Sequence, residues 1–499
     1  MDSNLLIIMS DEHQARAMGC AGHPFVRTPC LDRLAATGLR FVNAYTPSPI
    51  CVPARASFAT GLPVHKTRLW DNAMPYEGSI PGWGHALQRA GVAVESIGKL
   101  HYRAEEDPAG FDIEHLPMMV HEGVGMVWAS IRKENERVLP TSRMLGPYIG
   151  PGESAYTRYD RAVAECAVDW IRSRGKGAKG LRGSGSIKAS SDDPKREPWC
   201  LFVGFVAPHF PLVVAKEFFD LYPPHITGEA KLHPKKGYRR HPWVEKQNAL
   251  MDSEALFEDE AERLRAFAAY YGLVSSLDRH IESILSALKE SGLEDSTTIV
   301  YTSDHGDNLG TRGLWGKSTL YEESASIPLI LNGPGIAPGL CETPVDLLDL
   351  ASTIPAHFSI DFSGEGEDLL AIAAKPAEIE RPILSQYHAA GAVSGAFMLR
   401  KGRWKLIDYI DFEPELFDLE NDPEELDDLA SNSVFASTLE AMRAEMRSMI
   451  DPKAVDALAF ADQAAMIASY GGREKALRLG AAAATPVPKR VLGEIGGDR

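Results

Sequence analysis

Short apolar runs alternate with segments of helical periodicity through the first three-quarters of the chain. The apolar runs cover residues 5–9, 92–97, 199–206, 297–302 and 328–331, and each has the length of a buried strand. A helix is predicted from Pro29 to the terminating Gly38, with Thr28 as its N-cap. A second helix is predicted over about residues 258–291, where apolar side chains recur on one face. This alternation predicts an α/β fold with a mostly parallel central sheet flanked by helices.

The pattern changes after residue 374, which predicts a large domain over residues 1–374 followed by smaller units. Four short strands are expected at residues 382–387, 396–400, 404–408 and 415–419, with a helix over about 434–450. Residues 375–460 are therefore predicted to form a C-terminal α+β domain with an antiparallel sheet. The Ala-rich and then Gly/Pro-punctuated residues 461–499 are expected to form an arm that contacts another subunit of a homo-oligomer. Residues 173–197 lack periodicity and are predicted to be a flexible loop.

Composition and charge exclude several classes of protein. The 499 residues include 52 Lys plus Arg and 69 Asp plus Glu, which gives a net charge of −17. Nucleic-acid backbones attract basic residues, so this balance argues against a nucleic-acid partner, whereas a small anionic substrate needs only local positive charge. No apolar run approaches the ~18 residues of a membrane span. The first strand lacks the basic region and cleavage site of a secretory peptide, so a cytoplasmic protein is expected.

Ionisable residues follow four of the predicted strands. In chain order they are Asp11, Lys99 with His101, His209, and Asp304 with His305. Because the carboxyl ends of parallel strands meet at one edge of a sheet, we expect these side chains to share a cleft. Two carboxylates and an imidazole suit Ca²⁺, Mg²⁺ or Mn²⁺, and the imidazole slightly favours Mn²⁺. Taken singly, each strand-end Asp is better explained as the cap of a helix or turn, and it is the combination of two such acids with a His that makes a metal site equally plausible.

Cys51 differs from the other five cysteines, which show no paired spacing that would indicate a zinc cage or a disulfide framework. It lies just before a helix that Pro53 can begin and Gly61 can end. The positive end of the helix dipole and Arg55, one turn further on, are expected to make this thiol acidic and nucleophilic. A buried structural cysteine is the alternative, but it gives no reason for Arg55.

The sequence C-V-P-A-R at residues 51–55 resembles the C-x-P-x-R signature of type I sulfatases, in the alkaline-phosphatase-like superfamily. Residues 28–41, 98–101, 208–211, 303–322 and 415–424 are also similar to family motifs, so the resemblance covers nearly the whole chain. His305 and Asn72 resemble the choline-sulfatase and phosphonate-monoester-hydrolase branch. Two positions depart from the common pattern: Glu12 stands where many sulfatases have a second Asp, and Ala54 stands where the signature usually has Ser.

The resemblance implies a modified residue and a metal ion. In the family the signature cysteine is oxidised to formylglycine by a maturation enzyme, and this carries over to Cys51. One divalent cation, Ca²⁺ or Mn²⁺ with Mg²⁺ as an alternative, is then expected at a site formed by Asp11, Cys51, Asp304 and His305.

The resemblance also implies roles in the reaction. The hydrated aldehyde at position 51, activated by the metal and Arg55, attacks the sulfur of a small anionic sulfate ester. Lys99 is expected to neutralise the sulfate oxygens, and Asn72 to bind substrate. His209 and Lys317 are expected to bind the ester and to help protonate the departing oxygen. His101 is expected to accept a proton as sulfate is released.

The implied function is hydrolysis of sulfate monoesters, either aryl sulfates or alkyl sulfates such as choline sulfate. A phosphonate monoester or phosphodiester hydrolase of the same superfamily is the nearest alternative. In that branch the Lys and His after the second strand are commonly replaced by uncharged residues, so Lys99 and His101 favour sulfate esters. A metal-binding protein with an unmodified Cys51 is the non-enzymatic alternative.

Overall fold

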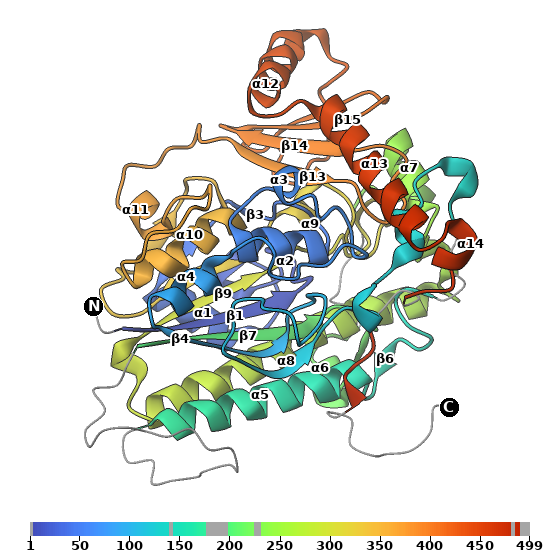
Figure 1. The fold of residues 1–499 in the computed structure, drawn as a ribbon. Coiled ribbons are helices and arrows are strands. Elements are labelled where there is room, and N and C mark those ends of the chain that lie inside the picture. Colours follow the sequence, from blue (N-terminus) through green and yellow to red (C-terminus); the bar gives the residue numbers. More distant parts are fainter. Residues whose placement is uncertain (1–2, 139–142, 176–197, 224–230, 481–484, 490–499) are drawn as a thin grey trace.

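The computed structural model describes residues 3–138, 143–175, 198–223, 231–480 and 485–489 (Figure 1). An eight-stranded sheet forms its centre, in the order β11-β2-β10-β9-β1-β7-β4-β5. Its strands are β1 (Asn4–Asp11), β2 (Leu39–Phe41), β4 (Ala93–Lys99), β5 (Ile113–Met118), β7 (Trp199–Pro208), β9 (Thr297–Ser303), β10 (Leu329–Asn332) and β11 (Gly339–Cys341). The pairs β9-β1, β1-β7, β7-β4, β4-β5 and β11-β2 are parallel, and β10 is antiparallel to both of its neighbours. The predicted mostly parallel sheet is confirmed.

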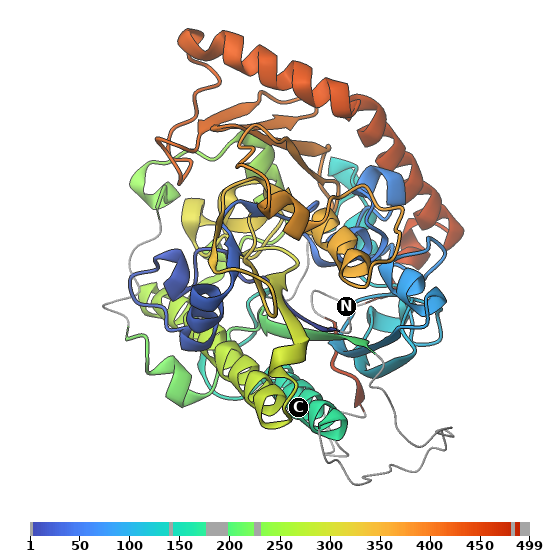
Figure 2. The same cartoon turned by 90° about the vertical axis from the view of Figure 1, so that its left-hand side faces the viewer.

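The central strand β1 is buried on both faces, because helices cover both sides of the sheet (Figures 1 and 2). Leu6 and Ile8 belong to the core shared with α1 (Pro29–Thr37), α5 (Ala155–Arg174) and α8 (Glu260–Glu290). Leu5 and Ile7 belong to the opposite core, shared with α2 (Cys51–Thr60), α4 (Trp83–Arg89) and α10 (Leu347–His357). A strand with two apolar faces reads as a continuous apolar run, which is why residues 5–9 could be recognised from the sequence.

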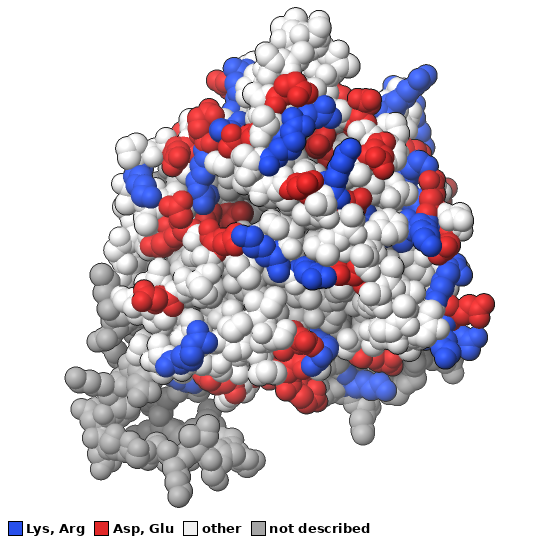
Figure 3. Space-filling view, turned by 45° about the horizontal axis from the view of Figure 1, so that its top comes forward, with Lys and Arg blue, Asp and Glu red and all other residues white. Residues whose placement is uncertain are grey.

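A second sheet of four antiparallel strands lies on the α2 side of the central sheet (Figure 1). Its strands are β13 (Ile383–Tyr387), β14 (Ala396–Lys401), β15 (Trp404–Tyr409) and β16 (Glu415–Asp418), and α12 (Ala436–Met449) packs against it. The predicted antiparallel sheet and its helix are confirmed. Figure 3 shows Lys and Arg interspersed with Asp and Glu on the face that includes this region.

The remaining elements are short, with one exception. α13 (Pro452–Ser469) is held to the residue that follows α3 (Val64–Thr67), because its Asp462 pairs with Arg68. The short elements are β3 (Ala44–Tyr45), β6 (Gly150–Pro151), β8 (Val213–Val214), β12 (Val345–Asp346), α3 (Val64–Thr67), α6 (Lys216–Phe219), α7 (Pro242–Asn248), α9 (Glu322–Ala325), α11 (Leu369–Ala373) and α14 (Arg473–Ala476).

Two sequence predictions fall wholly or partly outside the described residues. The loop predicted at 173–197 lies outside them from residue 176 to 197, and the arm predicted at 461–499 lies outside them at 481–484 and 490–499. Among the described residues, no helix combines the length and the apolar character needed to cross a bilayer.

Candidate active site

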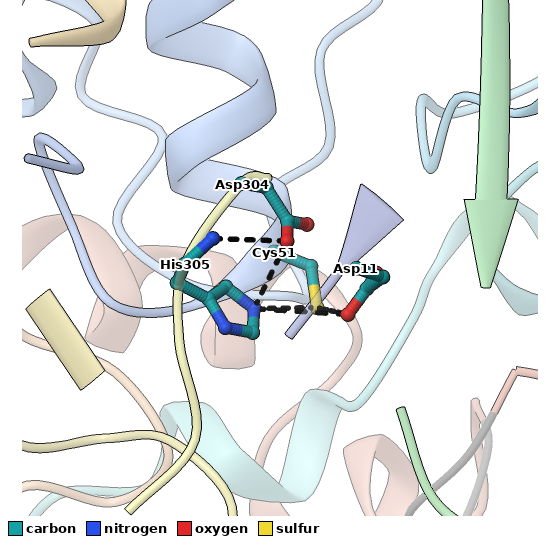
Figure 4. A group of neighbouring side chains, drawn as sticks. All are labelled: Asp11, Cys51, Asp304 and His305. Atoms are coloured by element: carbon teal, nitrogen blue, oxygen red, sulfur yellow. Dashed lines mark hydrogen bonds and ion pairs between the residues drawn. The ribbon is translucent and has the colours of Figure 1, made fainter. Parts of the chain in front are cut away.

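Four donor groups from three elements meet at the carboxyl edge of the central sheet (Figure 4). Asp11 ends β1, Cys51 begins α2, and Asp304 and His305 directly follow β9. Their candidate ligand atoms all lie within 4.8 Å of one another, and all four residues are buried. Cys51 Sγ is 3.3 Å from His305 Nε2 and 3.6 Å from Asp11 Oδ1. All four residues expected to form a metal site are therefore brought together.

The donor set fits a divalent cation. His305 Nδ1 lies 3.1 Å from the Gly306 carbonyl oxygen, which can only accept, so Nδ1 carries the proton and the Nε2 lone pair faces the cluster. His305 Nε2 is 3.6 Å from Asp304 Oδ1 and 3.8 Å from Asp11 Oδ1. Two carboxylates and a correctly oriented imidazole match the chemistry of Ca²⁺, Mn²⁺ and Mg²⁺ sites.

Arg55 lies under this cluster and connects its two acids. Its Nε donates to Asp304 Oδ2 at 2.8 Å, and its Nη2 donates to Asp11 Oδ2 at 3.3 Å. Lys99 Nζ is 2.5 Å from the same Asp11 oxygen. Burial alone would raise the pKa of Asp11, but Lys99, Lys317 and Arg55 hold that pKa well below its ordinary value. Asp11 is therefore fixed as a carboxylate.

The expectation of an acidic thiol at Cys51 is wrong for the unmodified side chain. Burial, reinforced by the charge of Asp11, raises the pKa of Cys51 to about 12. Arg55 does not offset this effect, because its guanidinium is paired with Asp11 and Asp304. Cys51 is also the first residue of α2, and Ile50 occupies the N-cap position, so the helix begins two residues before Pro53. The C-terminal end at Gly61 is as predicted, with a left-handed backbone conformation.

Lys317 and His209 approach the cluster from the cavity side. Lys317 Nζ donates to Cys51 Sγ at 3.2 Å and to Glu12 Oε2 at 3.0 Å. His209 Nε2 lies 3.4 Å from the same Glu12 oxygen, and its Nδ1 donates to the Phe210 carbonyl at 2.6 Å. Burial lowers the pKa of His209 well below its ordinary value, and the ammonium of Lys317 lowers it further. An ammonium therefore stands beside the sulfur at position 51, and a neutral imidazole lines the same cavity.

Asn72 contacts the start of α2, the helix that carries Cys51. Its Oδ1 accepts the backbone N–H of Val52 at 3.0 Å, so it satisfies one of the free donors at the start of α2. The adjacent Asp71 is buried and accepts from Ser130 Oγ and from Gln463 Nε2, both at 2.6 Å. Gln463 belongs to α13, which thus helps to hold the Asn72 loop in place.

His101 makes a contact that no sequence motif indicates. Its Nε2 lies 2.7 Å from the hydroxyl of Thr485, and Tyr156 OH donates to the Thr485 carbonyl at 2.6 Å. Burial lowers the pKa of His101 well below its ordinary value, and Lys99 acts in the same direction. Thr485, Tyr156 and Glu12 are site residues that the sequence reasoning did not select.

Six of the predicted residues line a single cavity, at whose base lies Cys51. These residues are Cys51, Asn72, Lys99, His101, His209 and Lys317. Beyond them the wall is largely apolar, with Met126, Met144, Leu250, Met251 and Trp315. Asp11, Arg55, Asp304 and His305 lie beneath Cys51 and complete the predicted set.

Comparisons with known proteins agree with this site and fold. Residues 3–360 match the family described as Sulfatase, and residues 310–452 match the family described as N-sulphoglucosamine sulphohydrolase, C-terminal. The Choline-sulfatase of Rhizobium meliloti (strain 1021) is 35% identical over 491 residues, which cover 96% of this chain and 92% of the relative. Arylsulfatase K of Bos taurus is 27% identical over 490 residues, which cover 91% of this chain and 83% of the relative.

The fold is also found in solved structures. The phosphonate monoester hydrolase of Agrobacterium radiobacter superposes with a TM-score of 0.69 at 20% identity, covering 89% of this chain and 95% of the other. This similarity concerns the fold, whereas the match over residues 3–360 extends over more than half of the chain. The protein belongs to the sulfatase family.

Proposed function

We propose that this protein is a sulfuric ester hydrolase that cleaves small anionic sulfate monoesters in the cavity above Cys51. The observation that carries the proposal is the meeting of Asp11, Cys51, Asp304 and His305 beneath a cavity lined by Lys99 and Lys317. Membership of the sulfatase family supports the same reaction class. A sulfate group brings negative charge, and fixed cations stabilise it better than water does.

Asp11, Asp304 and His305, together with the residue at position 51, would hold one Ca²⁺, Mn²⁺ or Mg²⁺ ion. Bound there, the ion would supply Lewis acidity to the oxygen at position 51 and to the sulfate group. We propose that this oxygen belongs to the hydrate of a formylglycine, which a maturation enzyme produces from Cys51. The unmodified thiol is a poor nucleophile, because burial raises its pKa to about 12.

The remaining residues act either on the sulfate group of the ester or on its leaving group. Lys99 and Lys317 bind the sulfate oxygens, and Asn72 and Arg55 hold the start of α2 so that position 51 faces the substrate. Lys317 stands on the leaving-group side and protonates the departing oxygen, whereas neutral His209, whose Nδ1 proton is given to the Phe210 carbonyl, binds the ester there. His101, whose depressed pKa keeps it neutral, accepts a proton from position 51 as sulfate is released.

Hydrolysis of phosphonate monoesters or phosphodiesters is the second candidate, because the phosphonate monoester hydrolase of Agrobacterium radiobacter shares this fold. Lys99 and His101 favour the sulfate ester. They add a second lysine and a proton acceptor close to the metal ligands, in the positions where the phosphonate branch commonly has uncharged residues. A non-catalytic metal-binding protein with an intact Cys51 thiol is the third and least favoured candidate.

Two measurements on the purified protein test the proposal. A mass spectrum of the peptide containing Cys51 should contain the formylglycine form, and 4-nitrophenyl sulfate should be cleaved with a higher kcat/KM than 4-nitrophenyl phosphate and phenyl phosphonate esters. An enzyme that carries formylglycine but prefers the phosphonate esters would favour the second candidate. An intact thiol without turnover of any ester would favour the third.

We also infer a reducing compartment, such as the cytoplasm, and a homo-oligomer. The six cysteines are all free thiols, as expected where disulfides do not persist. Asp462 and Gln463 of the proposed oligomerisation arm bond to Arg68 and Asp71 of their own chain, so a subunit contact through α13 would use its outer face. Light scattering coupled to size-exclusion chromatography tests the oligomeric state.

A further inference from the structure

Glu12 adopts a backbone conformation that turns it away from its neighbour Asp11. Its φ of 68° lies in the left-handed region, which is uncommon for a residue with a side chain. Its N–H donates to Asp304 Oδ1 at 3.2 Å, and Tyr270 OH donates to its carbonyl at 2.8 Å. The backbone is thus held from both sides, and such constrained conformations gather at functional sites.

The side chain of Glu12 is fully buried and lies among the groups on the leaving-group side. Oε2 accepts from Lys317 Nζ at 3.0 Å and lies 3.4 Å from His209 Nε2. The same ammonium is 3.2 Å from Cys51 Sγ, so one carboxylate oxygen holds it within reach of the reacting position. Oε1 has no hydrogen-bond partner among the described residues, and the absence of a side chain at Gly316 leaves room for it, since a Cβ there would lie 3.2 Å away.

Glu12 is not placed to complete the metal site. The group of donors from Asp11, Cys51, Asp304 and His305 does not include it. Oxygen donors of Glu12 and Asp11 also come within 4.8 Å of a nitrogen of His209, but the Lys317 ammonium occupies the Glu12 oxygen. A cation at that second position would stand next to an ammonium, and like charges in a buried site repel strongly.

We propose that Glu12 is a positioning residue for the leaving-group side of the reaction, holding Lys317 beside position 51, rather than a metal ligand. The inference rests on the proposed ester hydrolysis. A lysine side chain has four flexible torsions, so its ammonium stays beside one atom only if a fixed partner holds it. Protonation of the departing oxygen matters most when that oxygen is strongly basic.

The test compares sulfate esters of phenols with different acidities. For Glu12→Gln we expect kcat/KM to fall about 3-fold with 4-nitrophenyl sulfate but about 100-fold with phenyl sulfate, so that the rate depends more steeply on the leaving-group pKa. Metal content, measured by inductively coupled plasma mass spectrometry, should equal that of the wild type. Glu12→Asp, which keeps the carboxyl group but shortens its reach, should show a smaller steepening and provides the comparison should the Gln variant fail to fold.

A double-mutant cycle separates positioning from a general structural effect. In a Lys317→Met background, Glu12→Gln should lower kcat/KM for phenyl sulfate only a few-fold further, because its partner is already absent. Asp278→Asn is the matched control, since this buried carboxylate caps α1 through the N–H groups of Cys30 and Leu31, outside the active site. The control should lower thermal stability without changing the leaving-group dependence.

Three results would overturn the inference. They are an equal loss on both esters in Glu12→Gln, a loss of bound metal in that variant, and additive effects of Glu12→Gln and Lys317→Met. A wild-type enzyme that cleaves phosphonate esters and no sulfate would instead overturn the proposed function, and the same comparison on phosphonate esters would still test Glu12.

Discussion

The imidazole of His101 and the hydroxyl of Thr485 lie 2.7 Å apart, although 384 positions separate them in the chain. Thr485 also accepts a hydrogen bond from Tyr156 on α5, and Val487 is buried in the core that α5 and α8 share. The segment of residues 485–489 is therefore fixed on the catalytic side of the sheet, and Thr485 forms part of the cavity wall.

Replacing Thr485 with valine should impair the step in which His101 takes part. His101 Nδ1 is buried without a partner among the described residues, so Thr485 supplies the hydrogen bond that fixes the ring. We expect Thr485→Val to lower kcat about 5-fold with little change in KM, in line with a lost buried hydrogen bond of about 1 kcal/mol. Thr485→Ser keeps the hydroxyl and should retain wild-type kcat. Equal kcat for the valine variant and the wild type would contradict a role for this contact.

Removing the metal should lower both activity and stability. Dialysis against a chelator leaves two buried carboxylates without their cation, and binding stabilises a fold by about 2.7 kcal/mol at 100 times Kd. We expect the melting temperature to rise again when Mn²⁺, Ca²⁺ or Mg²⁺ is added, as followed by differential scanning fluorimetry. Asp304→Asn, which removes the charge of one donor, should show a much smaller rise. A wild-type melting temperature unaffected by all three ions would exclude the site.

Cys51→Ser should stop turnover after a single transfer. A serine hydroxyl can attack the sulfur, but it carries no second hydroxyl whose loss of a proton would expel sulfate. After incubation of this variant with 4-nitrophenyl sulfate, we expect peptide mass spectrometry to detect a sulfate group on the side chain at position 51. Cys51→Ala, which has no hydroxyl, should remain unmodified. Steady-state turnover by the serine variant at the wild-type rate would contradict the mechanism.

The parts of the site that could be predicted from sequence are those next to strong local signals. Asp304 and His305 follow a continuous apolar run, and the parallel-sheet rule places such residues at one edge. The short strands β2, β5 and β11 were missed, because three to six residues give too little periodicity.

Other features depend on distant contacts. The pKa of Cys51 is raised by burial and by the charge of Asp11, and Arg55 is paired with Asp11 and Asp304; the sequence near Cys51 contains neither carboxylate. The direction of the Glu12 side chain follows from a left-handed backbone held by Asp304 and Tyr270. Thr485 reaches His101 through the packing of the chain end, for which no local pattern exists.

Lys405 should be important for stability, because it neutralises two carboxylates buried between the C-terminal sheet and the loop after Lys317. Its Nζ lies 2.8 Å from Glu322 Oε1 and 2.7 Å from Glu425 Oε1. Lys405→Met removes the cation that both acids share, which should cost about 3–5 kcal/mol in thermal or urea unfolding. Lys401→Met, on the neighbouring strand, breaks a partly exposed pair with Glu445 and should cost less than about 1 kcal/mol. Similar losses for the two variants would contradict the assignment.

Glu415 should make the fold less stable as the pH rises towards neutrality. It is buried and accepts hydrogen bonds from Tyr321 OH at 2.9 Å and Tyr409 OH at 2.7 Å. Burial raises its pKa from 4.5 to about 7, so between these values the folded protein holds a proton that the unfolded chain releases. Unfolding therefore becomes more favourable as the pH increases through this window, and the effect levels off above about pH 7.

Glu415→Gln keeps a neutral side chain of the same size and removes this titration. The unfolding free energy of the variant minus that of the wild type should increase by about 2–3 kcal/mol from about pH 5 to pH 8. A shift of one pKa unit corresponds to about 1.4 kcal/mol. Urea unfolding of both proteins at the two pH values measures the difference. Glu420→Gln, an exposed position just after β16, is the control and should show the same difference from the wild type at both values. If the unfolding free energy of Glu415→Gln instead fell relative to that of the wild type as the pH rises, Glu415 would be ionised in the folded protein, because the sign of the linkage would be reversed.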